Sequence, residues 1–461
     1  MKKHILLTCV SLLVSLLSIS ASIEVRSTHM TTTDGLANNS ICYIFQDSKG
    51  FIWMGTLNGL SRYDGNSFVT FLPESESGNN RISLSTNHAR TISEDKNGFL
   101  WIETSGEFFN CYDLRKDCFV DFTGCGEYRQ NYDRKAEAAN GDVWLWNSRN
   151  GCRRVTYQNE AFSSVSFRKS LGNLPSDSVA YVYPDEQGNI WIGTDCGVVQ
   201  VTGDKTILVE KRNTFSAQSF GKDIFFLSTN GIISKKEENK PSVTVAHLQK
   251  EKSALTIYGT LCLQDDWVIF TSNGGYLFNT KTNRIHRQAE LDIKNGNVLT
   301  DNLGNFWIYN NTGKVWYVNS KTRALKTLQL STPDKLNYVD MERYHVVHDS
   351  RGIIWISTYG NGLFAYDTLT EEHFDFQIDG FSHISSNYLQ YLMEDSSGAI
   401  WVSSEYAGIA RLTILNEGIK RIFPEAVSLS DRSNTVRMIT RLKNDDICIG
   451  TRGGGVIVYD P

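Results

Sequence analysis

The stretch that decides the fold is Asp47–Thr56, which reads DSKGFIWMGT. The same ten-residue pattern returns as DKNGFLWIET at 95–104, DEQGNIWIGT at 185–194, DSRGIIWIST at 349–358 and DSSGAIWVSS at 395–404. Weaker copies occur at 140–144, 301–307 and 445–451, and degenerate ones at 223–231 and 265–274. Trp53, Trp101, Trp144 and Trp191 follow one another at intervals of 48, 43 and 47 residues. The chain is therefore a tenfold repeat.

Each part of the repeat has a mechanical reason. Asp-x-x-Gly joins two strands, because an aspartate side chain bonds turn amides and glycine accepts a positive φ. In the strand that follows, Phe51 and Trp53 face one side and Ile52 and Met54 the other. Both sides are apolar, so this strand is expected to lie between two neighbouring sheets. Four-stranded units at this period predict an all-β fold made of β-propeller blades.

The repeated tryptophans are interpreted as packing residues. A functional site occurs once in a protein, whereas a tryptophan that returns in every blade serves the contact between blades. The same holds for the repeated aspartates and glycines, which are expected to be structural.

Ten blades exceed the four to eight of typical rings, so two rings are the simpler interpretation. We predict a seven-bladed propeller over residues 23–330 and a partial second propeller of about three blades over 331–461. Residues 329–337, with Pro333, are the expected junction. The segment 23–29 resembles the outer strand before each later blade, so it should pair with a C-terminal blade and close a ring.

The first 22 residues predict a signal peptide. Lys2, Lys3 and His4 precede an apolar run from Ile5 to Leu17, and small residues follow it. The run is short for a membrane span, so cleavage and export to the periplasm are expected.

Composition narrows the partners. The net charge is −5 with no block of either sign, which argues against a nucleic-acid partner. Nine cysteines form no metal-binding C-x-x-C pair and no dense disulfide framework. Cys111 and Cys118 flank a short connection and are expected to face each other across a hairpin.

The pattern Asp-x-x-Gly-x-[Ile/Leu]-Trp-[Ile/Met]-Gly-Thr, followed by Gly-Leu and Tyr-Asp, resembles the two-component-regulator propeller repeat. The segment 33–40, TDGLANNS, is similar to the start of that family's sensor regions. The resemblance implies the periplasmic sensor region of a hybrid two-component system, with a membrane helix, a histidine kinase and output regions beyond it. Those regions are absent from residues 1–461, so we expect a truncated sensor without enzyme activity, attached to a membrane only through missing C-terminal parts.

The chemistry of a catalytic site is not apparent. His345 and His348 point to opposite faces of a strand, so they do not share a metal. No nucleophile or phosphate-loop motif occurs, and Gly453–Gly455 indicates a turn. We predict no catalytic residue, no metal and no cofactor.

Loops before the innermost strand and loops after the tryptophan strand should share one face, where function is expected. On that face we predict a ligand site, whose residues are Tyr359, Tyr406, Arg452, Glu405, His383 and Tyr388. Asn87, His88 and Arg90 belong to the same face of the first ring. Tyrosine and arginine suit an oligosaccharide or another small periplasmic ligand. The other partner considered is a second copy of the chain, in a homodimer. The alternatives are a carbohydrate-active lyase or sialidase, and a protein-interaction scaffold without a ligand.

Overall fold

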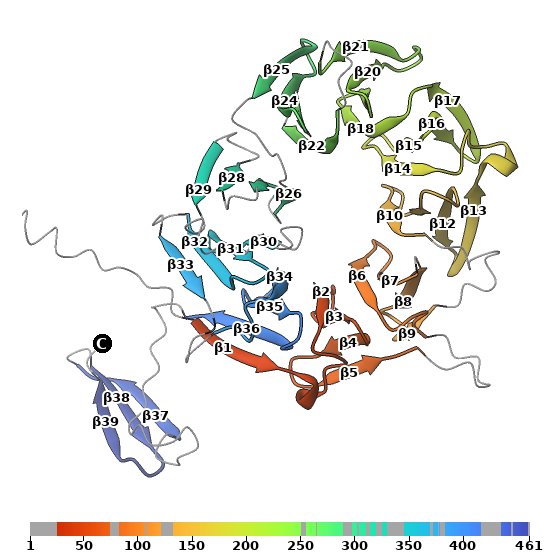
Figure 1. Cartoon of the computed structure of the whole chain (residues 1–461). Coiled ribbons are helices and arrows are strands. Elements are labelled where there is room, and N and C mark those ends of the chain that lie inside the picture. Colours follow the sequence, from red (N-terminus) through yellow and green to blue (C-terminus); the bar gives the residue numbers. More distant parts are fainter. Residues whose placement is uncertain are drawn as a thin grey trace, which may run out of the picture. The chain divides into compact units, whose positions relative to one another are not determined.

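The computed structural model describes residues 25–73, 83–106, 108–120, 132–249, 255–263, 265–288, 297–301, 304–309, 314–319, 325–329, 345–368, 372–376, 378, 383–415, 435–443 and 446–459 (Figure 1). Within these residues the regular structure is almost entirely β-strand, with short 3-10 helices at Thr32–Asp34 and Lys169–Leu171. No described helix is long and apolar enough to cross a membrane. The predicted all-β propeller is confirmed.

Nine antiparallel four-stranded sheets are numbered here in chain order, and most are simple meanders from the inner to the outer strand. Sheet 1 is β2(Ile41–Gln46), β3(Ile52–Thr56), β4(Gly59–Tyr63) and β5(Phe68–Phe71). Sheet 2 is β6(Ala89–Glu94), β7(Phe99–Thr104), β8(Phe108–Asp113) and β9(Cys118–Phe119). Sheet 3 is β10(Arg134–Glu137), β11(Val143–Trp146), β12(Cys152–Gln158) and β13(Ala161–Phe167). Sheet 4 is β14(Val179–Pro184), β15(Ile190–Thr194), β16(Gly197–Thr202) and β17(Lys205–Glu210).

The remaining sheets repeat this plan. Sheet 5 is β18(Thr214–Phe220), β19(Asp223–Ser228), β20(Ile232–Lys236) and β21(Val243–His247). Sheet 6 is β22(Ile257–Leu263), β23(Asp266–Thr271), β24(Gly274–Asn279) and β25(Arg284–Gln288), and sheet 7 is β26(Asn297–Thr300), β27(Phe306–Tyr309), β28(Lys314–Val318) and β29(Leu325–Gln329). Sheet 8 is β30(His345–His348), β31(Ile353–Ser357), β32(Leu363–Asp367) and β33(His373–Phe376). Sheet 9 is β34(Leu389–Glu394), β35(Ile400–Ser404), β36(Ile409–Ile414) and β1(Val25–Met30).

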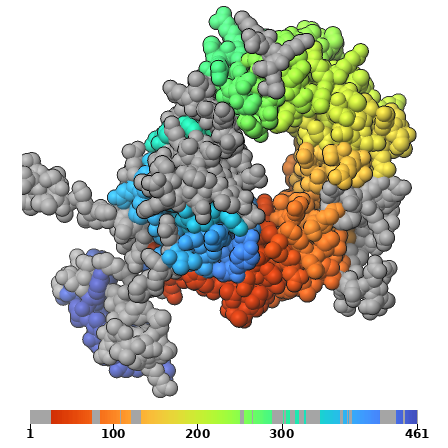
Figure 2. Space-filling view, in the orientation of Figure 1, coloured from red at the N-terminus to blue at the C-terminus, as the bar shows by residue number. Residues whose placement is uncertain are grey.

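The second strand of each sheet lies between two neighbours, as the sequence predicts. All five residues of β3, β15, β31 and β35 are buried. Successive sheets share apolar clusters, for example Trp53 of sheet 1 with Leu100 of sheet 2, and Trp144 of sheet 3 with Ile192 of sheet 4. In the space-filling view the first sheets follow one another from red through yellow to green, and the blue segment of sheet 9 lies beside the red sheet 1 (Figure 2).

The N-terminal strand closes the ring. β1 is hydrogen-bonded to β36 as the outer strand of sheet 9. Met30 of β1 and Trp401 of β35 then pack with Ile41 and Met54 of sheet 1 in one cluster. The prediction that the segment 23–29 pairs with a late blade and closes a ring is confirmed for its described part.

The grouping of sheets differs from the predicted seven and three. The predicted boundary at 330–331 lies outside the described residues, but the sheets on either side of it touch, because Trp307 of sheet 7 packs with Ile354 of sheet 8. One compact unit spans Val25–Thr413 and contains sheets 1 to 9. A three-stranded sheet, β37(Val436–Arg441), β38(Ile447–Thr451) and β39(Val456–Tyr459), belongs to a separate unit.

One carboxylate organises both the turn and the tryptophan of each regular repeat. Asp47 Oδ1 accepts the backbone N–H groups of Lys49 and Phe51 at 3.0 and 2.9 Å, as predicted for the turn. Its Oδ2 accepts the indole N–H of Trp53 at 2.7 Å. Five further Asp–Trp pairs make the same indole bond at 2.7 to 3.1 Å: Asp95–Trp101, Asp185–Trp191, Asp301–Trp307, Asp349–Trp355 and Asp395–Trp401.

Two tryptophans lack this acceptor. In sheet 3, Ala138 stands six residues before Trp144, where the regular repeat has aspartate. In sheet 6 the first two strands pair as far as Leu263 and Asp266, so the aspartate turn is absent there. The indole nitrogens of both tryptophans are buried without a hydrogen-bond partner. The backbone of the Ala138 turn keeps the bonds of the regular one, since Ala138 N–H donates to Asp142 O and Gly141 N–H to Ala138 O, both at 2.9 Å.

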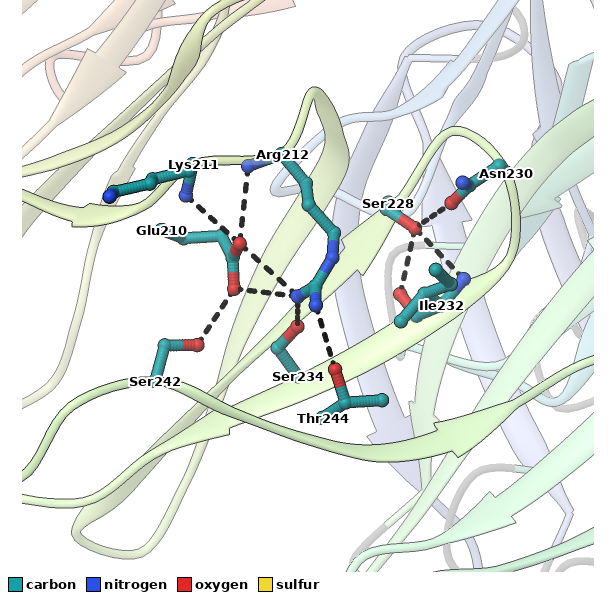
Figure 3. Close-up of polar contacts among 9 residues, drawn as sticks. All are labelled: Glu210, Lys211, Arg212, Ser228, Asn230, Ile232, Ser234, Ser242 and Thr244. Carbon is teal, nitrogen blue, oxygen red and sulfur yellow. Dashed lines mark hydrogen bonds and ion pairs between the residues drawn. The ribbon is translucent and has the colours of Figure 1, made fainter.

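Sheets 4 and 5 are also joined by a polar network at their outer strands (Figure 3). The Glu210 carboxylate, at the end of β17, accepts from Arg212 and from the Ser242 hydroxyl. The Arg212 guanidinium continues to Ser234 Oγ at 2.8 Å and to Thr244 Oγ1 at 2.9 Å, both in sheet 5. The network fixes the outer edge of sheet 4 against sheet 5.

We expect Asp47→Ala to lower the free energy of unfolding by about 2–4 kcal/mol, because it orphans the buried indole N–H of Trp53 together with two turn amides. Thermal denaturation measures the loss. Asp64→Ala is the matched control: Asp64 also accepts two turn amides but is exposed and bonds no tryptophan. Equal losses in the two variants would contradict the importance of the indole bond.

The reverse change is expected to stabilise sheet 3. Ala138→Asp supplies the acceptor that Trp144 lacks, in a turn whose backbone already has the required bonds. We expect the free energy of unfolding to rise by about 1 kcal/mol in denaturant titrations. Ala138→Asn, which offers a neutral acceptor, should give a smaller gain, and a loss of stability in both variants would refute the expectation.

Acid should weaken the fold through one of these carboxylates, that of Asp395. Burial alone would raise the pKa of Asp395, but hydrogen bonds from Ser397, Trp401 and the Ala399 backbone lower it below its usual value of 3.8. The unfolded chain then binds this proton more readily, so the contribution of Asp395 to stability is present above pH 3.8 and is lost as the pH falls through its folded pKa. Asp395→Asn should flatten this part of the stability curve, measured by chemical denaturation at stepped pH. An unchanged slope would contradict the assignment.

Candidate functional site

A recurring backbone bond defines one face of the sheets. The residue after the tryptophan strand donates its N–H to the carbonyl of the residue before the innermost strand of the same sheet. The pairs are Leu57–Ser40, Ser105–His88, Asp195–Ser178, Thr229–Asn213, Ser272–Thr256 and Glu405–Tyr388, at 2.8 to 3.3 Å. The prediction that these two groups of loops share a face is therefore confirmed.

A second backbone bond joins neighbouring sheets on this face. The glycine that opens the third strand, or precedes it, donates to the loop of the next sheet. The pairs are Gly59–Asn87, Gly151–Asp177, Gly362–Asn387 and Gly408–Asn39. A Cβ on Gly408 would meet Met30 O, at the end of β1 in the same sheet, at 2.2 Å, so this position requires glycine.

Sheets 8 and 9 carry longer loops on this face than sheets 1 and 4. In sheet 1 the Thr56 hydroxyl donates to Gly59 O, three residues on. In sheets 8 and 9 the equivalent bonds, Thr358 to Gly362 and Ser404 to Gly408, span four residues. The extra residue pushes Tyr359 and Tyr406 into loops that the packing of the sheets does not determine.

Three of the predicted site residues come together here. The Tyr359 hydroxyl donates to Glu405 Oε2, which links sheet 8 to sheet 9. The ring of Tyr359 meets that of Tyr388 edge to face, with centroids 5.2 Å apart, and their backbones form an isolated β-bridge. Tyr388 is 46% exposed, so this aromatic pair is partly open to solvent. The group is called the tyrosine–glutamate cluster below.

Two residues that sequence reasoning missed hold the cluster in place. The Ser40 hydroxyl of sheet 1 donates to Glu405 O. Asn387 accepts Gly360 N–H at 2.9 Å through its carbonyl and Ile378 N–H at 3.0 Å through its side chain. The signal for both was positional: each immediately precedes or lies next to an innermost strand, as Asn87 and His88 do.

Tyr406 and His383 lie beside the cluster along the chain but have other surroundings. Tyr406 is 69% exposed. His383 packs edge to face on Phe376, with ring centroids 5.9 Å apart. Burial and the nearby His383 together lower the pKa of His29 on β1.

Arg452 belongs to another unit than the cluster. It makes the recurring bond of this face, because its N–H donates to Thr435 O at 2.9 Å, but it belongs to the separate unit that contains β37–β39. Its predicted part in the ligand site therefore stays a prediction.

The residues predicted on the same face of the first ring form other contacts. Asn87 O accepts Gly59 N–H, and the His88 ring lies 3.4 Å from the Cys42 sulfur. Burial, followed by the charge of Arg90, lowers the pKa of His88. Arg90 itself lies 3.8 Å from Glu103, whose pKa burial raises.

The described residues contain no group of three metal-ligating side chains. The His345 ring packs tilted against that of Tyr391 of sheet 9, with centroids 3.9 Å apart. His348 faces Asn305 of sheet 7, so the predicted opposite orientation of the two histidines is confirmed. Burial lowers the pKa of His345 to about 4.

The expectation for Cys111 and Cys118 is wrong. The register of β8 and β9 pairs Cys118 with Asp113, and the Val120 N–H donates to Cys111 O at 2.8 Å. Both thiols are free, with Cys111 buried and Cys118 exposed.

Two segments of the chain match a known protein family. The family model for the two component regulator propeller matches residues 35–58 and 173–196. Each match starts before an innermost strand and ends in the loop after the tryptophan strand, so it covers the face described above.

Longer likenesses are more distant. Histidine kinase P4 of Formosa agariphila is 23% identical over 347 residues, covering 58% of this chain and 25% of that protein. The chain thus spans about a quarter of this relative's length. The extracellular domain assigned to hybrid two component system BT3049 of B. thetaiotaomicron is 19% identical, with 94% of this chain and 65% of that one covered and a TM-score of 0.39. Streptogramin B lyase is 11% identical, covering 85% of this chain and 98% of that one, with a TM-score of 0.41.

Proposed function

We propose, from the two-component regulator propeller repeats that this chain carries, that it is the ligand-sensing region of a two-component signalling protein. The ligand class we propose is a carbohydrate, and the place of binding is the face that carries the tyrosine–glutamate cluster. A periplasmic location is part of this proposal. It rests on the export signal predicted for residues 1–22, which lie outside the described residues.

The observation that carries the proposal is the bond between Tyr359 of sheet 8 and Glu405 of sheet 9. The two residues of this bond lie in loops that are one residue longer than the corresponding loops of sheets 1 and 4, so the packing of the sheets does not require the bond. Loops free of packing are where propellers and other rigid scaffolds carry binding residues.

The chemistry of the cluster fits a sugar. Tyr388 and Tyr406 expose aromatic faces on which the apolar side of a pyranose ring can lie. The Glu405 carboxylate accepts hydrogen bonds, so it can bind sugar hydroxyls when a ligand displaces the Tyr359 hydroxyl. Because Tyr359 and Glu405 belong to different sheets, such a ligand would change the contact between sheets 8 and 9, which is what a sensor requires.

The test is a thermal-shift titration of the full chain with a panel of neutral and acidic oligosaccharides. We expect one class to raise the melting temperature saturably. The double variant Tyr359→Ala/Tyr388→Ala should weaken binding about tenfold or more, equivalent to about 1.4 kcal/mol. Its unliganded melting temperature should change little, since neither side chain belongs to the core between the sheets.

The control is Tyr63→Ala, which removes a tyrosine at the opposite end of a sheet, where its hydroxyl donates to Gly65 O at 2.7 Å. Undiminished binding in the double variant would exclude the cluster as the site. Chemical turnover of an oligosaccharide would favour a carbohydrate-active enzyme, and the absence of any binding would favour a protein-interaction scaffold.

A further inference from the structure

In three sheets an arginine covers the repeated tryptophan. The arginine is the cross-strand partner of the tryptophan, one strand further out. Its guanidinium lies over the indole at 5.5 Å for Arg62 and Trp53, 6.0 Å for Arg154 and Trp144, and 5.6 Å for Arg411 and Trp401. These are cation–π distances.

Two of these arginines also reach an acid on the next sheet. Arg62 of sheet 1 forms an ion pair with Asp117, in the turn between β8 and β9 of sheet 2. Arg154 of sheet 3 pairs with Asp204 at 2.5 Å, in the turn between β16 and β17 of sheet 4. The same three groups therefore form a repeated set: an indole, the guanidinium that lies over it, and a carboxylate on the turn between the third and fourth strands of the next sheet, called the third turn below.

Between sheets 4 and 5 the set lacks its cation. The cross-strand partner of Trp191 is Gln200, whose amide turns aside to Asn189 Oδ1 at 3.2 Å. A groove of about 570 Å³ lies there, lined by Trp191, Gln200 and the third turn of sheet 5. That turn again supplies carboxylates, Glu237 and Glu238. The acid is present and the arginine that would meet it is absent.

One carboxylate of the groove is left for a cation. Its lining carries four carboxylates, of Asp185, Asp223, Glu237 and Glu238, and two ammonium groups, of Lys222 and Lys236. Asp223 and Glu237 are already paired with Lys235, at 2.8 and 3.3 Å, and Glu237 also with Lys240. Glu238 has no ion pair among the described residues, so its carboxylate is available to a ligand.

The walls of the groove suit an aliphatic stem and are held in place. Ile207 and Val209 of β17 line it, and Ile207 is 60% exposed. Glu210 follows directly and ties β17 to sheet 5 through Arg212 and Ser242 (Figure 3). The groove opens on the side of the Asp185 turn, at the opposite ends of the strands from the tyrosine–glutamate cluster.

We propose that this groove binds an arginine side chain of a partner polypeptide. The guanidinium takes the position over Trp191 that Arg62 and Arg154 occupy over their own tryptophans, and it pairs with Glu238. The stem lies along Ile207 and Val209. The proposal does not depend on carbohydrate sensing, since it uses other residues on another face.

The test is isothermal titration of the full chain with acetyl-Gly-Arg-Gly-amide. We expect saturable binding at one site, and binding at least several-fold weaker for the citrulline peptide, which has the same shape without the charge. Gln200→Arg fills the groove with the chain's own arginine, as in sheets 1, 3 and 9, and should abolish binding without lowering the melting temperature. Gln158→Arg, the same change at an exposed position on β12, should bind the peptide as the unaltered chain does.

A reciprocal variant tests whether any repeat tryptophan without its arginine, next to an acid of the following sheet, binds the peptide. Arg154→Gln uncovers Trp144 while Asp204 stays in place, so the stoichiometry of peptide binding should rise from one to two. No saturable binding by the unaltered chain, equal binding of the citrulline peptide, or full binding by Gln200→Arg would each overturn the proposal. A stoichiometry of one in Arg154→Gln would contradict the repeated set, and equal binding of free L-arginine would overturn the polypeptide as its source.

Discussion

The hydrogen bond from a tryptophan indole to the aspartate six residues before it is the constraint on which the sheets depend. Stacked sheets exclude water from the contact between them, so a polar atom placed there needs a partner within the protein. The largest side chain in that contact carries an N–H group. The aspartate at the turn accepts it with one oxygen and the turn amides with the other, so one residue fixes both the reversal of the chain and the orientation of the ring.

The sheets that depart from the regular motif are subject to the same constraint. Sheet 5 has neither residue: Phe225 stands in the tryptophan position, and β18 and β19 pair as far as Phe220 and Asp223, so the aspartate turn is absent. A phenyl ring needs no acceptor. Sheets 3 and 6 keep the tryptophan without the aspartate, and they have orphaned indole nitrogens in Trp144 and Trp267. Losing both members together costs little, whereas losing the acceptor alone leaves a buried donor unsatisfied.

The sequence allowed some of these features to be predicted because they are local. The turn amides of Asp47 and the burial of both faces of β3 follow from a single copy of the repeat. The pairing of β1 with a late sheet is not local, and it was predicted by comparing residues 23–29 with the outer strands before later blades. The indole bond was missed because it depends on the depth of the indole in the contact rather than on spacing. The number of sheets in one unit could not be predicted, since the contact between sheets 7 and 8, through Trp307 and Ile354, uses the same residues of the motif as every other contact. For the site, Tyr359, Tyr388 and Glu405 could be placed on one face, but their contact required the extra residue in two neighbouring loops.

The two ends of the strands are free to differ in function because the motif makes different demands on them. At the aspartate end the motif fixes the turn and the tryptophan, whereas the third strand varies: Gln200 stands where sheets 1 and 3 have Arg62 and Arg154. At the other end the motif requires only backbone bonds and a glycine, so the side chains of Tyr359, Glu405 and Tyr406 are unconstrained by packing. A single substitution therefore has different consequences at the two ends. At position 200 it opens or fills the groove between sheets 4 and 5 without disturbing the Asp–Trp bond. At position 359 it alters the contact with Glu405 between sheets 8 and 9, which the fold does not require. Binding properties can change at either end while the contacts that hold the sheets together stay the same.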